Sequence, residues 1–217
     1  MVIWLIKIIE IAMSANFAAY GILPKQVIGL RGILFSPLIH GDFRHLISNS
    51  LPLLILGTIL FNSYKEVAWK IIMMAYFLVG GLVWLTATGS SIHIGASGVV
   101  YGLAFFLLAS GIFRKDRESI GIALVVTLLY GGLIWGILPV QAGISWESHL
   151  YGAVVGIVTA FYYRKIGERK EDASWYDLEI DEVDEHLPFF ELLERKEAED
   201  DEQRKFLPPS NNPTDFQ

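Results

Sequence analysis

The sequence predicts an all-α membrane protein in which six transmembrane helices form a bundle and both chain ends lie in the cytoplasm. Of its 217 residues, 53% are hydrophobic, and the mean hydropathy of +0.45 exceeds that of an ordinary soluble domain. Six stretches approach the roughly 20 apolar residues that cross a bilayer core as a helix. Basic residues gather beside alternate connections between these stretches, which sets their direction.

Charge divides the chain into two parts. Residues 1–167 carry 11 Lys and Arg against 6 Asp and Glu, whereas residues 168–217 carry 6 against 17. We therefore expect a six-span domain over 1–165 and an acidic, mostly disordered cytoplasmic tail over 166–217 that is free to bind a cytoplasmic partner. This charge pattern does not indicate nucleic-acid binding. The absence of cysteine excludes disulfides and thiolate metal sites.

The expected spans follow in order along the chain, at residues 2–20, 43–62, 66–87, 95–113, 118–138 and 147–163. Lys7 and Glu10 interrupt the first span, but at a spacing of three residues they can pair on one helix face. This segment could be misread as a signal peptide. No basic region precedes its apolar stretch and Lys7 lies inside it, which favours a retained span.

Lys and Arg flank the second, fourth and sixth spans at their carboxyl ends, and the positive-inside rule places those ends in the cytoplasm. The residues concerned are Lys65, Lys70, Arg114, Lys115, Arg117, Arg164, Lys165, Arg169 and Lys170. These three spans then run from outside to inside. Their outer ends carry His45 and Asn49, then Ser97, then His149. Four polar residues are thus predicted at one depth, where polar groups within a span usually mark a site or a helix contact.

Glycine spacing predicts which spans meet. Gly98 and Gly102 lie four residues apart on the fourth span, and Gly152 and Gly156 do so on the sixth. Small residues at this spacing allow close helix contact in lipid. Contact between the two faces would bring the serine within reach of the histidine, with Tyr101 packed against the imidazole.

Serine and histidine together predict acyl transfer, because a histidine can accept the serine proton near neutral pH. The tetrahedral oxyanion also needs donors. The free N–H groups of the helix start at Gly95–Gly98 and the side chains of His45 and Asn49 can supply them. Glu147 is two residues from His149 and on another helix face, so we expect a Ser–His dyad without a third member.

Simpler interpretations stay open for single residues, since an isolated serine or histidine within a span usually bonds a neighbour. His93 is a rival base, four residues before the serine. His40, Asp42 and His45 suggest a metal site, but nothing completes a ligand set. Val99 stands where a Gly-x-Ser-x-Gly elbow requires glycine, which argues against an α/β-hydrolase.

Three segments in combination resemble the rhomboid intramembrane serine proteases, in that family's order and on the expected spans. They are LIHGDFRHLISN at 38–49, GASGVVYG at 95–102 and HLYGAVVG at 149–156. One departure lies in the first loop, where many members have a Trp-Arg pair and residues 21–41 contain Arg31 but no tryptophan.

The resemblance implies Ser97 as nucleophile and His149 as base. It also implies an oxyanion hole formed by His45, Asn49 and the Ser97 N–H, with Tyr101 as packing partner of the base. The implied protein is an endopeptidase of the plasma membrane without metal or organic cofactor. It would open its site to the exterior, sit among membrane lipids and cleave single-pass transmembrane proteins.

Two other functions remain as alternatives. One is a non-proteolytic rhomboid-like protein that binds transmembrane clients, although such relatives usually lack the serine or the histidine. The other is a small transporter, which predicts ionisable residues near the bilayer midplane. Lys7 and Glu10 in the first span are almost alone in that respect.

Overall fold

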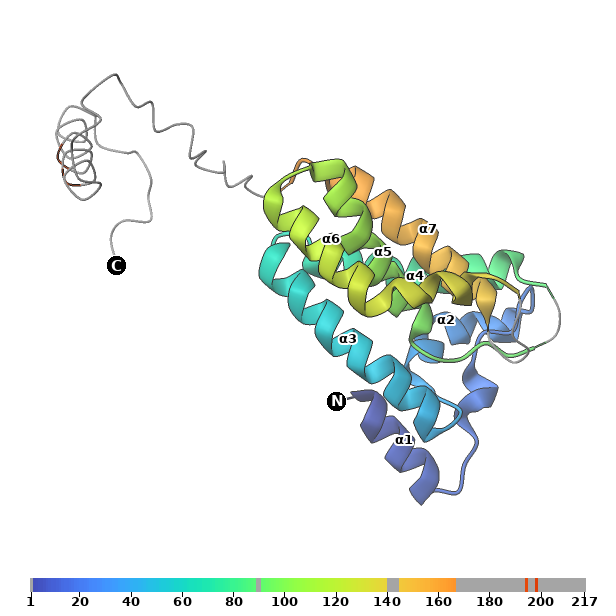
Figure 1. The fold of residues 1–217 in the computed structure, drawn as a ribbon. Coiled ribbons are helices and arrows are strands. Elements are labelled where there is room, and N and C mark those ends of the chain that lie inside the picture. The colour runs from blue at the N-terminus through green and yellow to red at the C-terminus, as the bar shows by residue number, and fades with distance from the viewer. Residues whose placement is uncertain (1, 89–90, 140–144, 167–193, 195–197, 199–217) are drawn as a thin grey trace, which may run out of the picture. The chain divides into compact units, whose positions relative to one another are not determined.

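The computed structural model describes residues 2–88, 91–139 and 145–166, together with 194 and 198 (Figure 1). The chain divides into two compact units, Met1–Asp172 and Ala173–Gln217. Nearly all of the predicted acidic tail at 166–217 lies outside the described residues. The helical bundle belongs to the first unit.

The described part of this unit is helical, as predicted. Its α-helices are α1 (Val2–Ala12), α2 (Arg31–Phe35), α3 (Phe43–Ser63), α4 (Ala68–Thr86), α5 (Ser97–Arg114), α6 (Arg117–Tyr130) and α7 (Trp146–Tyr163). Four 3₁₀ helices join them, namely η1 (Phe17–Tyr20), η2 (Val27–Leu30), η3 (Ser36–Leu38) and η4 (Gly131–Ile137). Strand-like pairing among the described residues is confined to an isolated antiparallel bridge between Ile22 and His93.

Four helical segments of the described chain are long and apolar enough to cross a membrane: Phe43–Ser63, Ala68–Thr86, Ser97–Arg114 and Arg117–Ile137. They match the second to fifth predicted spans. The sixth predicted span corresponds to α7, which has 18 residues. Its first turn holds Glu147, Ser148 and His149, and this polar turn lowers the hydropathy of the helix.

The prediction of one helix over residues 2–20 is wrong beyond Ala12. The helix α1 has 11 residues, which at 1.5 Å per residue is about 16 Å, against roughly 30 Å for the bilayer core. Ser14 then takes a positive φ of 48°. Asn16 begins a separate 3₁₀ turn, where its side chain accepts the N–H of Ala18. Polar residues after Ala12 thus end the helix that hydropathy predicted to continue to residue 20.

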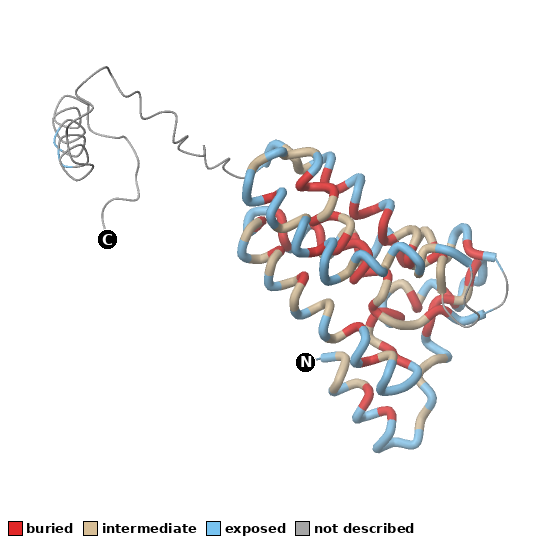
Figure 2. The backbone as a smooth tube through the Cα atoms, in the orientation of Figure 1, coloured by how far each residue is buried: buried red, intermediate tan, exposed pale blue. Residues whose placement is uncertain are grey.

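The helix α5 forms the centre of the bundle, and its most extensive contact among the described elements is with α7. In the apolar segment Ser97–Arg114, which is α5, 72% of residues are buried, whereas in the most apolar part of Arg117–Ile137, which joins α6 and η4, 6% are buried. Figure 2 shows the same contrast, with burial concentrated along α5 and exposure along α6. The main core cluster includes Leu56, Leu60, Ile71, Leu103, Phe106 and Leu107. Exposed apolar side chains on the outer faces suit contact with lipid tails rather than water.

The predicted contact between the glycine faces of α5 and α7 is confirmed. A Cβ atom added to Gly152 would lie 2.3 Å from the carbonyl oxygen of Gly98, and one added to Gly156 would lie 2.4 Å from that of Gly102. Real Cβ atoms essentially never approach so closely. Glycine therefore sets the separation of the two helices that carry Ser97 and His149.

Candidate active site

Ser97 is the first residue of α5, and it is half-buried rather than enclosed. The chain enters this helix through Gly95, whose φ of +106° is one that residues with a side chain rarely adopt. The Gly95 N–H donates to the carbonyl of Ser36 at 2.8 Å, which fixes the entry. The Ser97 N–H lies in the first turn, where N–H groups have no acceptor within the helix.

His149 lies in the first turn of α7, and its Nε2 atom is 2.9 Å from Ser97 Oγ. Its Nδ1 atom is 2.9 Å from the carbonyl oxygen of Gly136. A carbonyl can only accept, so Nδ1 must carry the proton in this contact. Nε2 of the neutral ring is then left with a lone pair that accepts the serine O–H. The predicted proximity of these two side chains is confirmed.

Tyr101 packs flat on the imidazole, as predicted from its place one turn after Ser97. The two rings are stacked with centroids 4.1 Å apart and planes 5° apart. The Tyr101 hydroxyl donates to the carbonyl of Leu133 at 2.9 Å. The histidine ring is therefore held at its face by the tyrosine and at its edge by a backbone oxygen.

Both of these carbonyl acceptors belong to η4, which sequence reasoning missed. The predicted span 118–138 contains no polar side chain at the depth of the serine, so the sequence predicts no contribution from it there. The glycines Gly131, Gly132 and Gly136 were the available signal, because glycine weakens an α-helix. A Cβ atom on Gly136 would lie 1.9 Å from the Tyr101 hydroxyl oxygen, so this position has no room for a side chain.

His45 and Asn49 lie one turn apart on α3. Asp42 caps this helix, accepting the His45 N–H at 2.7 Å. The imidazole of His45 would be 2.5 Å from a Cβ atom on Gly95, and Asn49 Nδ2 would be 3.6 Å from it. Nδ2 is buried and has no hydrogen-bond partner in the described structure. An unpartnered amide donor therefore lies next to Gly95, two residues before the serine in the chain.

His40 lies close by, where its imidazole contacts the backbone before α5 and the ring of His45. The Ala96 N–H donates to its Nε2 atom at 3.4 Å. Burial, assisted by the charge of His45, lowers the pKa of His40 to about 4, so it is neutral at pH 7. Among the described residues, no group of three or more His, Cys, Asp or Glu side chains is arranged to hold a metal ion.

His93, the rival base, bonds elsewhere. Its Nδ1 atom meets the Ser145 hydroxyl, and that oxygen lies 2.7 Å from the hydroxyl of Ser148. Its backbone N–H and carbonyl both pair with Ile22 at 2.9 Å. The hydrogen bond that Ser97 makes to an imidazole is with His149.

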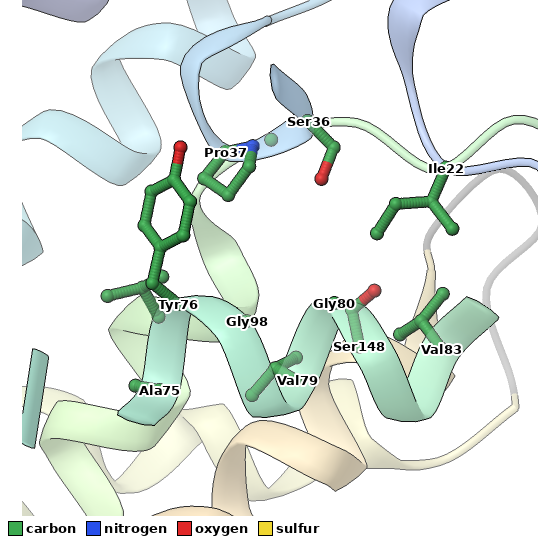
Figure 3. Close-up of a pocket in the computed structure, with 12 residues that line it drawn as sticks. Ile22, Ser36, Pro37, Ala75, Tyr76, Val79, Gly80, Val83, Gly98 and Ser148 are labelled. Carbon is green, nitrogen blue, oxygen red and sulfur yellow. The ribbon is translucent and has the colours of Figure 1, made fainter. Parts of the chain in front are cut away.

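A small, partly open cavity lies between α4 and the start of α5, and about 20 Å³ of it is open to water-sized molecules, enough for about one water. Figure 3 shows α4 on one side, with Tyr76, Val79 and Val83, and Ser36 and Pro37 opposite. Gly95, Gly98 and Ser148 also line it. These last three lie within two residues of Ser97 or His149 in the chain, but the Ser97 and His149 side chains themselves do not line the cavity.

Comparison with known proteins places the chain in a family. The family model of the Rhomboid domain matches residues 27–166. Uncharacterised proteins of Mycobacterium tuberculosis and Mycobacterium bovis are 36% identical to this chain, over 79% of its length and 74% of theirs. A Bacillus subtilis protein named "Putative rhomboid protease YdcA" is 25% identical, over 61% of this chain and 67% of its own. With a family match over more than half of its length, this chain belongs to the rhomboid family and is a multi-pass integral membrane protein.

Proposed function

We propose that the protein is an intramembrane serine endopeptidase that cleaves peptide bonds in or near transmembrane helices of its substrates. The observation that carries this proposal is the 2.9 Å contact between Ser97 Oγ and His149 Nε2. The two side chains come from the first turns of α5 and α7, two helices that are mostly apolar beyond that turn. Membership of the rhomboid family supports the same reaction class.

In the proposed mechanism, Ser97 and His149 form a catalytic dyad. Ser97 Oγ attacks the scissile carbonyl carbon while His149 Nε2 accepts the hydroxyl proton. The bond from Nδ1 to the Gly136 carbonyl (2.9 Å) supports the required tautomer and also stabilises the imidazolium that forms. His149 then gives the proton to the leaving amine. Water attacks the acyl-enzyme by the same route, which releases the second product and restores the serine.

The oxyanion of each tetrahedral intermediate is assigned to Asn49, His45 and the Ser97 N–H. The buried, unpartnered Nδ2 of Asn49 is the strongest support, because a buried donor without an acceptor is costly unless a ligand uses it. Removing one such donor typically lowers kcat by about 10²–10³-fold. We expect that loss for Asn49→Ala, with little change in KM.

The membrane topology proposed from the sequence would let water and substrate reach the site from the outer side of the membrane. The proposed direction of α3, α5 and α7, from outside to inside, would place Ser97 and His149 near the outer surface of the plasma membrane. The small cavity beside Gly98 and Ser148 would then have room for a water molecule near the site. Single-pass transmembrane proteins and lipids are the proposed partners, with no metal or cofactor needed. The acidic tail stays a candidate for a cytoplasmic contact.

The test is cleavage of a model transmembrane substrate by the purified full chain in proteoliposomes. Ser97→Ala and His149→Ala, which remove the nucleophile and the base, are compared with the wild type. We expect cleavage by the wild type and none above background by either variant. A wild type that binds the helix without cutting it would overturn the proposal in favour of client binding. Cleavage that survives Ser97→Ala would locate the activity elsewhere.

A further inference from the structure

A buried ion pair lies on α1, away from the proposed catalytic side chains. Lys7 and Glu10 are only 9% and 8% exposed, and Lys7 Nζ lies 2.8 Å from Glu10 Oε2. The pairing expected from their spacing is confirmed. Two charges taken out of water cost free energy that their attraction only partly recovers, so an apolar pair could anchor α1 at least as well. The charges therefore point to a specific role.

The ammonium group of Lys7 binds the loop that precedes α3. Besides Glu10 it donates to the carbonyl oxygens of His40 at 3.0 Å and Gly41 at 2.9 Å. An ammonium has three N–H donors, and these three contacts use them all. The other carboxylate oxygen of Glu10 accepts the Phe17 N–H at 2.8 Å. The pair is thus fully bonded, and its two carbonyl partners belong to one short loop.

That loop contacts both chain segments that form the proposed oxyanion hole, the residue before α5 and the first turn of α3. The His40 imidazole accepts the N–H of Ala96, the residue before the nucleophile. Asp42, two residues further on, caps α3 through the His45 N–H. The rings of His40 and His45 also meet edge to face, with centroids 5.0 Å apart. A shift of the loop would therefore move both the start of α5 and the first turn of α3.

We propose that Lys7, held by Glu10, is a positioning residue that sets the alignment of the oxyanion donors through the loop at 39–42. This inference rests on the proposed function and deepens it. The hydrogen bonds of the Lys7 ammonium go to Glu10 and to the two loop carbonyls, not to the nucleophile or the base. Its effect runs through the carbonyl groups of His40 and Gly41.

The chain offers a matched control on the same helix. Trp4 Nε1 donates to the Ser50 hydroxyl at 2.9 Å, and its ring lies 6.3 Å from that of Phe43, centroid to centroid, so this side chain ties α1 to α3 by a hydrogen bond that does not involve the two loop carbonyls. Trp4→Phe removes that hydrogen bond and leaves both loop carbonyls bound. A role limited to docking of α1 would make this variant and a Lys7 variant behave alike.

The experiment measures kcat, KM and thermal unfolding of the full chain in proteoliposomes with a transmembrane substrate. Lys7→Met combined with Glu10→Gln removes the ammonium without leaving an unpaired buried carboxylate. We expect this double variant to lower kcat by about 10–100-fold, because misalignment costs less than loss of a whole donor. KM should change little, because the affected contacts act in the transition state. Lys7→Arg, which keeps a cation with several donors, should recover part of kcat.

Two results would overturn the inference while leaving the protease intact. One is a double variant with wild-type kcat. The other is an equal loss of kcat in Trp4→Phe, which would mean that general docking of α1 matters. A wild type without cleavage rejects the proposed function itself, and the inference with it. An unchanged kcat for Trp4→Phe, with a lower unfolding temperature, supports the inference when the double variant is slow.

Discussion

Gly152→Ala tests whether the closeness of α5 and α7 is what joins Ser97 to His149. The added Cβ would lie 2.3 Å from the Gly98 carbonyl oxygen and 2.8 Å from the Tyr101 Cβ. The first of these atoms is backbone and cannot rotate away. The helices must therefore separate, or one must tilt.

The size of the effect can be worked out from these distances. Ordinary contact begins near 3.4 Å, so the Cβ lacks 1.1 Å of space (3.4 minus 2.3) toward the Gly98 oxygen. A separation of that size would stretch the 2.9 Å contact between serine and histidine beyond hydrogen-bond range. Misplacement by about 1 Å can cost about 10²-fold in rate. Overpacking of this kind typically destabilises by about 1–3 kcal/mol.

The assay is cleavage of the transmembrane substrate together with thermal unfolding, for Gly152→Ala and for Gly57→Ala on α3. A Cβ on Gly57 meets nothing within 4 Å. That control should keep its rate and gain slightly in stability, because alanine is the better helix former by about 1 kcal/mol. A Gly152→Ala variant with the wild-type cleavage rate and unfolding temperature would refute the reasoning. It would mean that α5 and α7 can accept a methyl group between them without separating.

Two further predictions concern the surroundings of the imidazole and the loop before α3. Gly136→Ala should reduce cleavage, because its Cβ would meet the Tyr101 hydroxyl oxygen at 1.9 Å. Adding Tyr101→Phe removes that oxygen and leaves the ring carbon 3.1 Å from the new Cβ, so the double variant should cleave faster than Gly136→Ala alone. A double variant that cleaves more slowly than Gly136→Ala would contradict the geometry. Burial and the charge of His45 hold the pKa of His40 at about 4 instead of 6.5. The unfolded chain then binds the extra proton between these pH values, so the unfolding temperature should fall from pH 6.5 to about 4 and level off below. The slope should be smaller in His40→Gln, and equal slopes would exclude His40 as the source.

Much of the proposed site could be predicted from the sequence because its side chains follow helix periodicity. Ser97 and Tyr101 lie one turn apart, as do His45 and Asn49, so each pair shares a helix face. The alternating direction of the spans then brings the helix ends to one depth. Glycine at four-residue spacing identified the two faces that meet, since a Cβ atom added to Gly152 would lie only 2.3 Å from the Gly98 carbonyl oxygen.

Other parts could not be predicted, because backbone groups provide them. The carbonyl of Gly136 orients the imidazole of His149, and any residue type offers the same carbonyl group. That oxygen is available only because the chain leaves the α-helix at Gly131 and forms η4. The hydropathy of residues 118–138 predicts one continuous span there.

Sequence alone therefore determined the helical class, the helix pair that carries Ser97 and His149, and the pairing of Lys7 with Glu10. The spacing of residues within a few helical turns of one another is enough to predict each of these three features. Only the tertiary structure decided that the Gly136 carbonyl meets the imidazole of His149, and that the Lys7 ammonium reaches carbonyl oxygens more than thirty residues away, at His40 and Gly41. Contacts between backbone atoms of distant segments depend on how the helices pack, and no local pattern of side chains records them.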